Sequence, residues 1–215
     1  RETMELYTVC ADTVAQLPQV LLQKHLPQRC ARAETFRREE DRLRCLGAGL
    51  LLRAVLGAEE AALRYEEFGK PYLPGGPACS LSHGGSFAAL AVDDGPVGVD
   101  LEPLDAARLR MAPSLLTREE LGWMRQGDET ERFFALWTLK ESAVKATGRG
   151  ISGSPRSIQV LPVEPGRAHI RDGAAWYADW LRSENCVLAV TAGHPFEMPQ
   201  VREMSKNRLQ MRLEG

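Results

Sequence analysis

Residues 129–148, ETERFFALWTLKESAVKATG, form the most extended helical pattern in the chain. Asp128 with Glu131 makes an N-terminal capping pair, and Gly148 is a natural C-terminal stop. At 100° per residue the apolar side chains of this stretch fall on one wide arc. The pattern therefore predicts a long helix with one broad face packed in a core.

Ionisable side chains interrupt the apolar side of this predicted helix. Lys140 falls inside the apolar arc, and Glu141 and Lys145 lie at its edge beside Trp137. Such groups are costly next to a core unless they are paired or bind a ligand. One interpretation is structural: Lys140 extends its ammonium to solvent, and Glu141–Lys145 is an ordinary surface pair. The other is functional: Glu141 supplies an oxygen ligand to a metal, and Lys145 meets a phosphate.

A strand pattern precedes this helix at residues 97–102, which read VGVDLE. Alternate side chains of a strand share a face, so the apolar residues would point into a core and leave Asp100 and Glu102 together on the other face. Carboxylates separated by about 7 Å of strand repel each other unless a cation lies between them. Oxygen ligands of this kind suit Mg²⁺. The structural alternative is an acidic strand end that faces solvent.

Shorter patterns surround these two. We expect a helix over residues 14–25 that is interrupted near Pro18, a longer helix over 33–56, and helical structure again from residue 104. Residues 93–96, DDGP, are typical of a hairpin turn. Strands are expected at 63–67, 78–82, 87–92, 96–102, 158–163, 175–181 and 186–192. A short similarity between residues 89–98 (ALAVDDGPVG) and VLAV at 187–190 with the Gly-Pro-containing turn that follows favours two similar halves.

Composition excludes several classes of protein. The chain has 215 residues and 23.8 kDa, which is long for one domain and short for two. It is 44% hydrophobic and 26% charged, with a mean hydropathy of -0.27, which is typical of a globular protein rather than a disordered, collagen-like or disulfide-stabilised one. The net charge of -2 and the pI of about 6.2 disfavour nucleic acid as a partner.

Membrane and leader segments are not expected from the sequence. The longest apolar stretch, residues 46–57, is interrupted by Arg53 and is too short for a membrane helix. The chain starts at Arg1 and shows no basic segment followed by an apolar one, so we expect no signal peptide. Its five cysteines include no CxxC pair, which predicts reduced thiols in the cytoplasm and no cysteine-based zinc site.

A third motif, Ser82-His83-Gly84-Gly85, directly follows a predicted strand. Imidazole nitrogens and backbone N–H groups beside small residues can contact an anionic ligand. The alternative is a structural Ser-His pair. The sequence has no G-x-S-x-G, G-x-G-x-x-G or G-x-x-x-x-G-K-[ST] motif, which disfavours a serine hydrolase, a Rossmann site and a P-loop.

Four motifs in order resemble one enzyme family. They are Gly69-Lys70-Pro71, Ser82-His83, GVDLE at 98–102 and WTLKESAVKATGRG at 137–150. Their order and separations resemble those of the 4′-phosphopantetheinyl transferases of the larger, surfactin-synthetase-activator (Sfp-like) type, over about residues 29–151. Gly84 departs from the pattern, because many relatives have serine after the histidine.

The resemblance implies a reaction and the residues that perform it. These enzymes move the 4′-phosphopantetheine arm of coenzyme A onto a serine of an apo acyl or peptidyl carrier protein and release 3′,5′-ADP. Asp100, Glu102 and Glu141 would hold Mg²⁺, with Mn²⁺ as an alternative. Glu141 is also a candidate base for the carrier serine, while Lys145 and His83 would contact phosphate.

The same resemblance assigns further positions to coenzyme A. Those that match its contacts are Arg29, Arg32, Arg44, Lys70, Pro71, Ser82, His83 and Lys145. For the arginines, a solvated helix face is the structural alternative. Glu120 matches a third acidic ligand of some relatives, but Thr117-Arg118-Glu119-Glu120 is a capping box, and we favour the cap. Lys140 is expected to shape the site through its neighbours.

The expected fold is α+β: a pseudo-twofold fusion of two similar α/β halves, each a small antiparallel-rich sheet packed with a long helix. The halves would be residues 1–103 and 104–215, with the active site at their junction in one monomer. An acidic carrier would dock on residues 104–116, where the candidate contacts are Arg108, Arg110, Met111 and Leu115. Two other functions stay open: a non-catalytic protein that binds coenzyme A or a carrier, and a metal-dependent phosphohydrolase.

Overall fold

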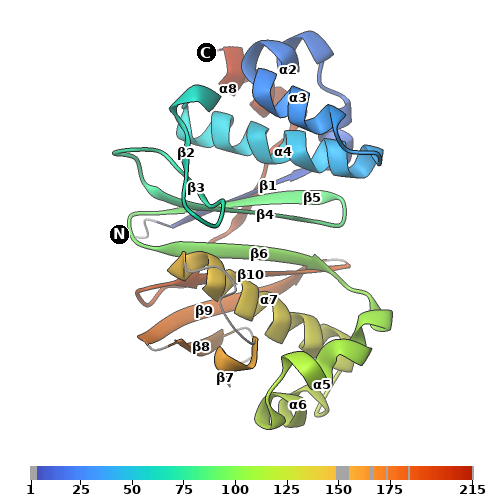
Figure 1. Ribbon diagram of the computed structural model, residues 1–215, viewed down its shortest axis with the longest axis vertical. Coiled ribbons are helices and arrows are strands. Elements are labelled where there is room, and N and C mark those ends of the chain that lie inside the picture. The colour runs from blue at the N-terminus through green and yellow to red at the C-terminus, as the bar shows by residue number, and fades with distance from the viewer. Residues whose placement is uncertain (1–3, 149–154, 165–166, 173, 184, 215) are drawn as a thin grey trace.

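Two β-sheets lie face to face at the centre of the molecule, and each carries a long helix on its outer face (Figure 1). The computed structural model describes residues 4–148, 155–164, 167–172, 174–183 and 185–214. In the first sheet the strand order is β11-β1-β5-β4, and in the second it is β6-β10-β9-β8-β7. A short hairpin, β2-β3, stands apart from both sheets.

The strands are β1 (Glu5–Cys10), β2 (Arg64–Tyr65), β3 (Pro71–Tyr72), β4 (Ala78–Gly84), β5 (Phe87–Asp93), β6 (Val97–Pro103), β7 (Gln159–Glu164), β8 (Arg167–Asp172), β9 (Ala174–Ser183), β10 (Cys186–Ala192) and β11 (Val201–Glu203). The α-helices are α1 (Ala11–Ala15), α2 (Gln19–His25), α3 (Pro27–Glu34), α4 (Glu39–Leu56), α5 (Ala112–Leu115), α6 (Arg118–Met124), α7 (Glu129–Thr147) and α8 (Lys206–Glu214). Short 3-10 turns are η1 (Glu60–Ala62), η2 (Ala106–Met111) and η3 (Pro155–Ser157).

Three apolar layers hold these elements together. The first lies between α4 and the outer face of the first sheet, with Leu50 and Leu90 fully buried. The second lies between the two sheets, where Ala89 of β5 and Val99 of β6 belong to one buried cluster. The third lies between α7 and the second sheet and contains Phe133. The predicted apolar arc of α7 and the predicted core face of β6 are both confirmed.

Close contact between α7 and β6 depends on Gly98. A Cβ at this position would lie 1.9 Å from the main-chain oxygen of Ser142 and 2.4 Å from the nitrogen of Ala146. A side chain there is therefore incompatible with the observed helix position. This approach is what brings the polar edge of α7 onto the strand that carries Asp100.

The two sheets repeat one connection pattern. In the first, β1 pairs with β5 and β5 with β4, and α4 intervenes between β1 and β4. In the second, β6 pairs with β10 and β10 with β9, and α7 intervenes between β6 and β9. This order agrees with two similar halves, while the twofold relation itself stays a prediction.

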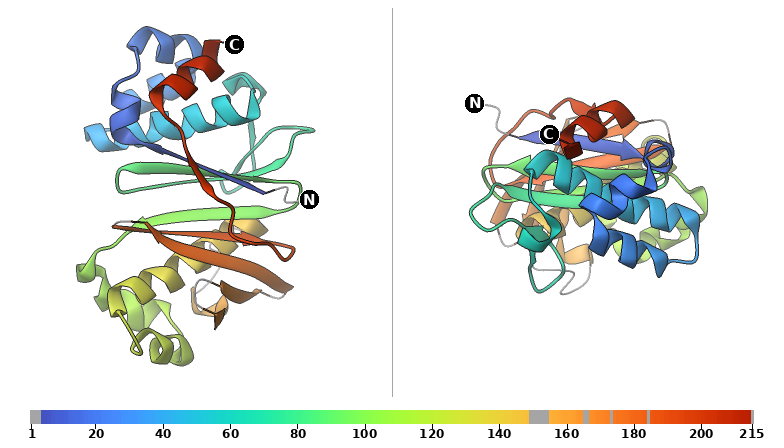
Figure 2. Two further views of the ribbon diagram at one scale, coloured as in Figure 1. Left: turned by 180° about the vertical axis from the view of Figure 1, so that it is seen from behind. Right: turned by 90° about the horizontal axis from the view of Figure 1, so that it is seen from above.

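The division of the chain at residue 103 also stays a proposal. In the structure β6, the last strand before residue 104, pairs with β10 and so belongs to the second sheet. After β10 the chain returns to the first sheet, where β11 pairs with β1 and α8 packs beside α4 (Figure 2). The second sheet thus includes β6 from the first part of the sequence, and the first sheet includes β11 from the second part.

The expected single helix over 33–56 is wrong. α3 ends at Glu34 and α4 begins at Glu39, with Arg38 in an extended conformation between them. Phe36 packs against the first core, and its amide donates to the Ala33 carbonyl at 3.1 Å. Burial of this aromatic side chain turns the chain where the helical pattern alone would continue.

The expected hairpin at 93–96 is wrong as well. β5 pairs with β1 and β4, whereas β6 pairs with β10, so the turn carries the chain from one sheet to the other. The apolar faces of β5 and β6 pack against each other instead of forming a hydrogen-bonded pair. β1, β8, β11 and α8 were not expected. All five cysteines are free, and no helix in the described part of the chain is long and apolar enough to cross a membrane.

Candidate active site

The edges of the two sheets meet along β4 and β6, where serine hydroxyls join them. The Ser80 Oγ accepts from the Val99 amide at 3.0 Å, and the Ser82 Oγ accepts from the Leu101 amide at 3.2 Å. Gly84 continues the contact, because a Cβ there would lie 2.3 Å from the Leu101 carbonyl oxygen. The seam fixes β4 and β6 side by side, and the candidate site residues lie along it.

Asp100 lies at the centre of this seam and is buried, with 6% of the residue exposed. Its Oδ1 accepts from the Ser82 hydroxyl at 2.8 Å and from the Lys145 ammonium at 2.7 Å. Its Oδ2 is buried and has no hydrogen-bond partner. A buried carboxylate oxygen without a donor is costly and is a position where a cation would be favourable. Ser82 thus orients Asp100.

One edge of α7 faces the two acidic residues of β6. Trp137, Glu141 and Lys145 are spaced by four residues and therefore share a line along the helix. The indole Nε1 of Trp137 donates to Glu102 at 3.1 Å, while Lys145 reaches Asp100. Glu141, between these two anchors, lies alongside both strand carboxylates.

Glu102 is held by two donors. Besides Trp137, the Arg108 guanidinium donates to its Oε2 at 2.8 Å. Arg108 also lies over the ring of Phe134, with its carbon 5.2 Å from the ring centroid. Glu102 is therefore positioned by one residue of α7 and one residue of η2.

Glu141 has the most perturbed carboxylate of the site. Burial, followed by the negative charges of Asp100 and Glu102, raises the pKa of Glu141 to about 7, against which Lys145 and Arg108 act. A carboxyl group with a pKa near neutrality can take or give a proton at physiological pH. This property suits proton transfer, and it also marks an excess of negative charge that a divalent cation would relieve.

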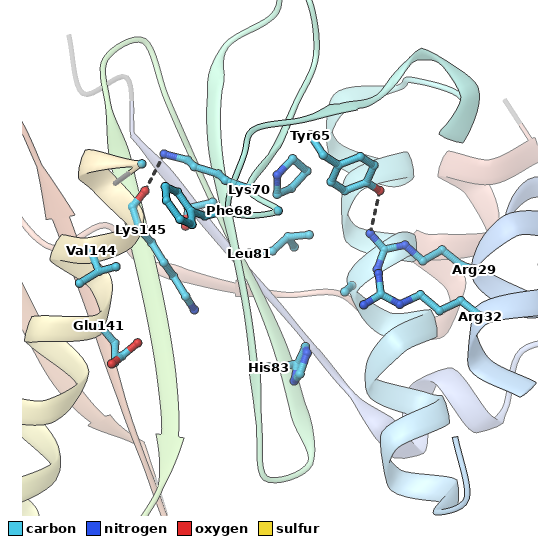
Figure 3. Close-up of a pocket in the computed structure, with 15 residues that line it drawn as sticks. Arg29, Arg32, Tyr65, Phe68, Lys70, Leu81, His83, Glu141, Val144 and Lys145 are labelled. Carbon is cyan, nitrogen blue, oxygen red and sulfur yellow. Dashed lines mark hydrogen bonds between the residues drawn. The ribbon is translucent and has the colours of Figure 1, made fainter. Parts of the chain in front are cut away.

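A cavity of about 520 Å³ opens between α7, the β2-β3 hairpin and α3 (Figure 3). Its walls carry acidic, basic and aromatic side chains, and its volume is in the range of small-molecule sites. It is lined by Arg29, Arg32, Ala48, Tyr65, Phe68, Gly69, Lys70, Pro71, Ser80, Leu81, His83, Glu141, Val144, Lys145 and Gly148.

Arg29 and Arg32 enter the cavity from α3, opposite α7 (Figure 3). Both oxygens of Glu60 accept from the first turn of α3, including the Arg29 amide at 3.0 Å, which fixes the start of the helix. The stem of Arg29 crosses α4 at Gly49, where a Cβ would lie 2.7 Å from its Cγ. The guanidinium of Arg29 then meets the Tyr65 hydroxyl at 3.4 Å.

His83 lies on the cavity wall between these groups. Its pKa is lowered by the loss of hydration around the ring and then by the positive charges of Arg44 and Lys145. Arg44 itself donates to the Gly85 carbonyl at 2.8 Å and pairs with Asp41, so it sits behind His83 and does not line the cavity. The region is cationic, which suits an anionic ligand.

Lys70 and Pro71 line the cavity from the hairpin. The Lys70 ammonium donates to the carbonyl of Val97 at 3.0 Å and to that of Lys145 at 2.8 Å. Burial lowers the pKa of Lys70, while the Glu66 charge acts in the opposite direction. Lys70 thus connects the hairpin to the start of β6 and the last turn of α7.

Lys140 and Glu120 form a buried pair away from the cavity. Their Nζ and Oε2 atoms are 2.9 Å apart, and each side chain is 1% exposed. Lys140 also donates to the carbonyls of Pro155 and Ile158. The interpretation that Lys140 extends to solvent is wrong. Glu120 completes the capping box with Thr117, as favoured from the sequence.

The candidate metal ligands on β6 pair with basic side chains in this structure. Within the described ranges, no group of three or more His, Cys, Asp or Glu side chains is arranged to hold a metal ion. Asp100 and Glu102 point to Lys145 and Arg108 instead. The orphan Oδ2 of Asp100 and the raised pKa of Glu141 nevertheless fit a hard cation with oxygen ligands.

The candidate docking segment lies at the end of the seam. Arg110 and Met111 of η2 are exposed, whereas Leu115 of α5 and Arg108 are half-buried. Because Arg108 holds Glu102, the segment is connected directly to the carboxylate site.

Several cavity residues were not singled out in the sequence. Tyr65 and Phe68 are exposed aromatic side chains of the hairpin region, and an aromatic residue just before Gly69-Lys70-Pro71 was a usable signal. Ser80 follows the alternation of β4 with Ser82. The contacts of Glu102 depend on the packing of α7 and had no local signal. Arg149 and Gly150, at the end of the fourth motif, lie outside the described residues.

Comparisons with known proteins agree on one family. A family model described as the 4′-phosphopantetheinyl transferase superfamily matches residues 96–191. The chain is 30% identical over 183 residues to a 4′-phosphopantetheinyl transferase of Bacillus subtilis, covering 78% of this chain and 80% of the relative. It is 27% identical over 184 residues to the 4′-phosphopantetheinyl transferase Sfp of Bacillus subtilis (strain 168), covering 79% and 82%.

Among solved structures, one similar chain is the holo-[acyl-carrier-protein] synthase from Neisseria meningitidis. It has 24% sequence identity and a TM-score of 0.40, and the match covers 46% of this chain and 98% of that one.

Proposed function

Because the chain belongs to the 4′-phosphopantetheinyl transferase superfamily, and to its Sfp-like type, we propose that it transfers the 4′-phosphopantetheine arm of coenzyme A to a carrier protein. The acceptor is a serine of an apo acyl or peptidyl carrier protein, and the second product is 3′,5′-ADP. The observation that carries the proposal is the seam at which Asp100, Glu102, Glu141 and Lys145 meet beside a cationic cavity.

In this proposal the cavity binds coenzyme A. Arg29 and Arg32 of α3 would contact its 3′-phosphate or pyrophosphate, with His83 and Lys145 nearer the reacting phosphorus. Guanidinium and ammonium groups on opposite walls suit a ligand that carries phosphate at two separate positions, as coenzyme A does at its 3′-phosphate and its pyrophosphate. Their shared exposure to a single cavity of about 520 Å³ supports this assignment. Pro71 and the Gly84 region would form the wall around the nucleotide, and Arg44 would hold the turn after His83 through the Gly85 carbonyl.

The transfer exchanges one P–O bond for another. The serine oxygen attacks the phosphorus that carries pantetheine, the bond from that phosphorus to the bridging oxygen breaks, and 3′,5′-ADP leaves with the bond electrons. The serine proton must be taken up, and the carboxylate of Glu141, whose pKa is raised to about 7, is the candidate acceptor. The Lys145 ammonium would stabilise the negative charge on the departing phosphate.

A divalent cation fits the donors of the site. Asp100, Glu102 and Glu141 would hold Mg²⁺ or Mn²⁺, and the bound ion would neutralise charge on the pyrophosphate. The unsatisfied Oδ2 of Asp100 supports this assignment. Ser82 and Trp137 then keep two of the ligands oriented, because each donates to one of the carboxylates.

The proposal includes the partner and its docking place. A carrier protein would approach η2 and α5, where Arg110 and Met111 are exposed beside the seam. We propose a cytoplasmic monomer that acts on carrier proteins and has no nucleic-acid or membrane partner. The free state of all five cysteines supports a reducing compartment.

The test is a carrier modification assay. Incubation of the protein with coenzyme A, Mg²⁺ and a panel of apo carriers should add the mass of one phosphopantetheine per carrier, with stoichiometric 3′,5′-ADP. Asp100→Ala and Glu141→Ala should each abolish the mass gain while circular dichroism and the thermal midpoint show a folded protein. Glu129→Ala, an exposed acid at the start of the same helix, is the matched control and should react normally.

Other outcomes would replace the proposal. Release of 4′-phosphopantetheine without a carrier would indicate a phosphohydrolase. Binding of coenzyme A or a carrier without turnover on any carrier, while a reference transferase modifies the same panel, would indicate a binding protein. Normal rates for Asp100→Ala or Glu141→Ala would remove the proposed metal site.

A further inference from the structure

The hairpin region between β2 and β3 forms a thin wall of the cavity. Residues 64–69 are all exposed, and a second cavity of about 570 Å³ lies on the other side, sharing Lys70, Pro71 and Gly148 with the first. Little apolar burial therefore holds this wall in place. Exposed segments with few buried contacts open at low cost unless polar contacts fix them.

Besides the contact of Tyr65 with Arg29 of α3, the polar contacts of the wall end on α7 and β6. The tip of the hairpin lies against the end of the helix, since a Cβ at Gly148 would be 2.8 Å from Glu66 Oε2. From the same tip the Lys70 ammonium donates to the Lys145 carbonyl at 2.8 Å (Figure 3). It also donates to the Val97 carbonyl at 3.0 Å. Carbonyls in the last turn of a helix attract cations, so this site suits an ammonium.

These two carbonyls belong to α7 and β6, the elements that carry Lys145 and Asp100. Lys145 donates to Asp100 Oδ1 through its own side chain, and Val97 precedes Asp100 by three residues on β6. Lys70 therefore contacts the backbone of Lys145 itself and the start of the strand that carries Asp100.

We propose that Lys70 is a positioning residue: its ammonium fixes the hairpin wall, Lys145 and the start of β6 relative to one another and does not bind a phosphate of coenzyme A. The proposal rests on the assigned function and differs from the role that the family resemblance gives to Lys70. Part of its effect passes through the position of the Lys145 side chain, so its removal should matter less once that side chain is absent.

The first test needs no ligand. In Lys70→Met, amide hydrogen exchange of a peptide covering residues 64–72 should be about tenfold faster than in the unaltered protein, because the wall loses two charge-assisted hydrogen bonds. Lys24→Met, a change of an exposed lysine on α2, should leave that exchange unchanged. Unchanged exchange in Lys70→Met would overturn the proposal, whether or not the protein proves to be a transferase.

The second test separates a positioning role from phosphate binding. Calorimetric titration with coenzyme A over a range of salt concentrations should show about tenfold weaker binding for Lys70→Met with an unchanged salt slope. Arg29→Ala should flatten the slope, because a half-buried cation that meets phosphate at the cavity wall is still screened by salt. A flattened slope for Lys70→Met would identify Lys70 as a phosphate ligand and overturn the proposal.

A double variant completes the argument. In a Lys145→Ala background, Lys70→Met should weaken coenzyme A binding less than it does in the unaltered protein, because only its effect on the wall and on β6 is then lost. Fully additive losses would show that Lys70 does not act through Lys145. If Lys70→Met does not fold, Lys70→Gln removes the charge but keeps a donor and carries the same three measurements. Failure of the unaltered protein to bind coenzyme A would contradict the assigned function, and the exchange experiment would still decide the positioning role.

Discussion

Removal of Lys140 should destabilise the protein more than removal of its partner Glu120. Both side chains are 1% exposed, and their charged atoms are 2.9 Å apart. Lys140→Met leaves a buried carboxylate without its countercharge and leaves the carbonyls of Pro155 and Ile158 without their ammonium donor. Loss of one partner of a buried pair costs about 3–5 kcal/mol.

Glu120→Gln is expected to cost less, about 2 kcal/mol. The carboxylate of Glu120 accepts from the Thr117 amide through Oε2 at 2.7 Å and from the Val160 amide through Oε1 at 2.9 Å. The amide side chain keeps one oxygen, so it retains one of these two bonds and loses the other. Lys140 meanwhile keeps its two carbonyl partners. The double variant should cost less than the sum of the single ones by at least about 1.5 kcal/mol, because it leaves no unpaired buried charge.

Urea unfolding at pH 7 measures these free energies of unfolding. Glu119→Gln is the matched control: it lies next in sequence on α6, its contact with Gln159 is exposed, and it should change the free energy by less than about 0.5 kcal/mol. A cost below about 1 kcal/mol for Lys140→Met, or additive costs in the double variant, would refute the buried-pair argument.

Three further predictions concern pH and packing. Burial raises the pKa of Glu141 to about 7, so the folded state keeps a proton that the unfolded chain releases near pH 4.5. The free energy of unfolding therefore falls as the pH rises from about 4.5 to about 7. Glu141→Gln lacks this loss, so its free energy of unfolding should rise by about 1 kcal/mol relative to that of the unaltered protein between pH 4.5 and pH 8, after allowance for partial exposure. Urea titrations without divalent cations measure this, and a difference that does not change with pH would contradict it. Gly98→Ala should cost about 3 kcal/mol and slow transfer, because its Cβ meets a main-chain oxygen of α7 at 1.9 Å; an unperturbed urea midpoint would show that α7 can move away. Hydrogen bonds to the Pro195 carbonyl and to Asp93 raise the pKa of His194, so the stability that its charged form contributes is complete below pH 6.5 and is lost as the pH rises through the folded pKa. His194→Gln should therefore lower the free energy of unfolding by about 0.5 kcal/mol at pH 5.5 and by less at pH 8. A larger cost at pH 8 would contradict this assignment.

The elements that the sequence predicted well carry their signal locally. α7 has a capping residue, an apolar arc and a terminal glycine within one stretch, and β10 was predicted with the bounds observed. β1 had no comparable pattern. It lies between β11 and β5 and is buried on both faces, so the polar alternation of a half-exposed strand is missing.

The site was predictable in its residues but not in their contacts. The spacing of Asp100 and Glu102 on a strand and of Glu141 and Lys145 on a helix placed them on the correct faces, and family resemblance brought them together. Which cation meets which carboxylate depends on how α7 and η2 pack, and this is a long-range property. For Lys70 the same limit applies, because its two acceptors are 27 and 75 residues away in sequence.

The pairing of β1 with β11 has a consequence for synthesis on the ribosome. Leu6 is opposite Val201, and α8 completes the first apolar layer with Leu209 and Leu213. Residues 97–192, in contrast, contain the whole second sheet and α7. Loop closure over nearly 200 residues is slow compared with local pairing. The second sheet and α7, which are synthesised later, can therefore fold first. The first apolar layer stays incomplete until residues near 213 have left the ribosome, and during that interval its residues are the most exposed to chaperones and aggregation.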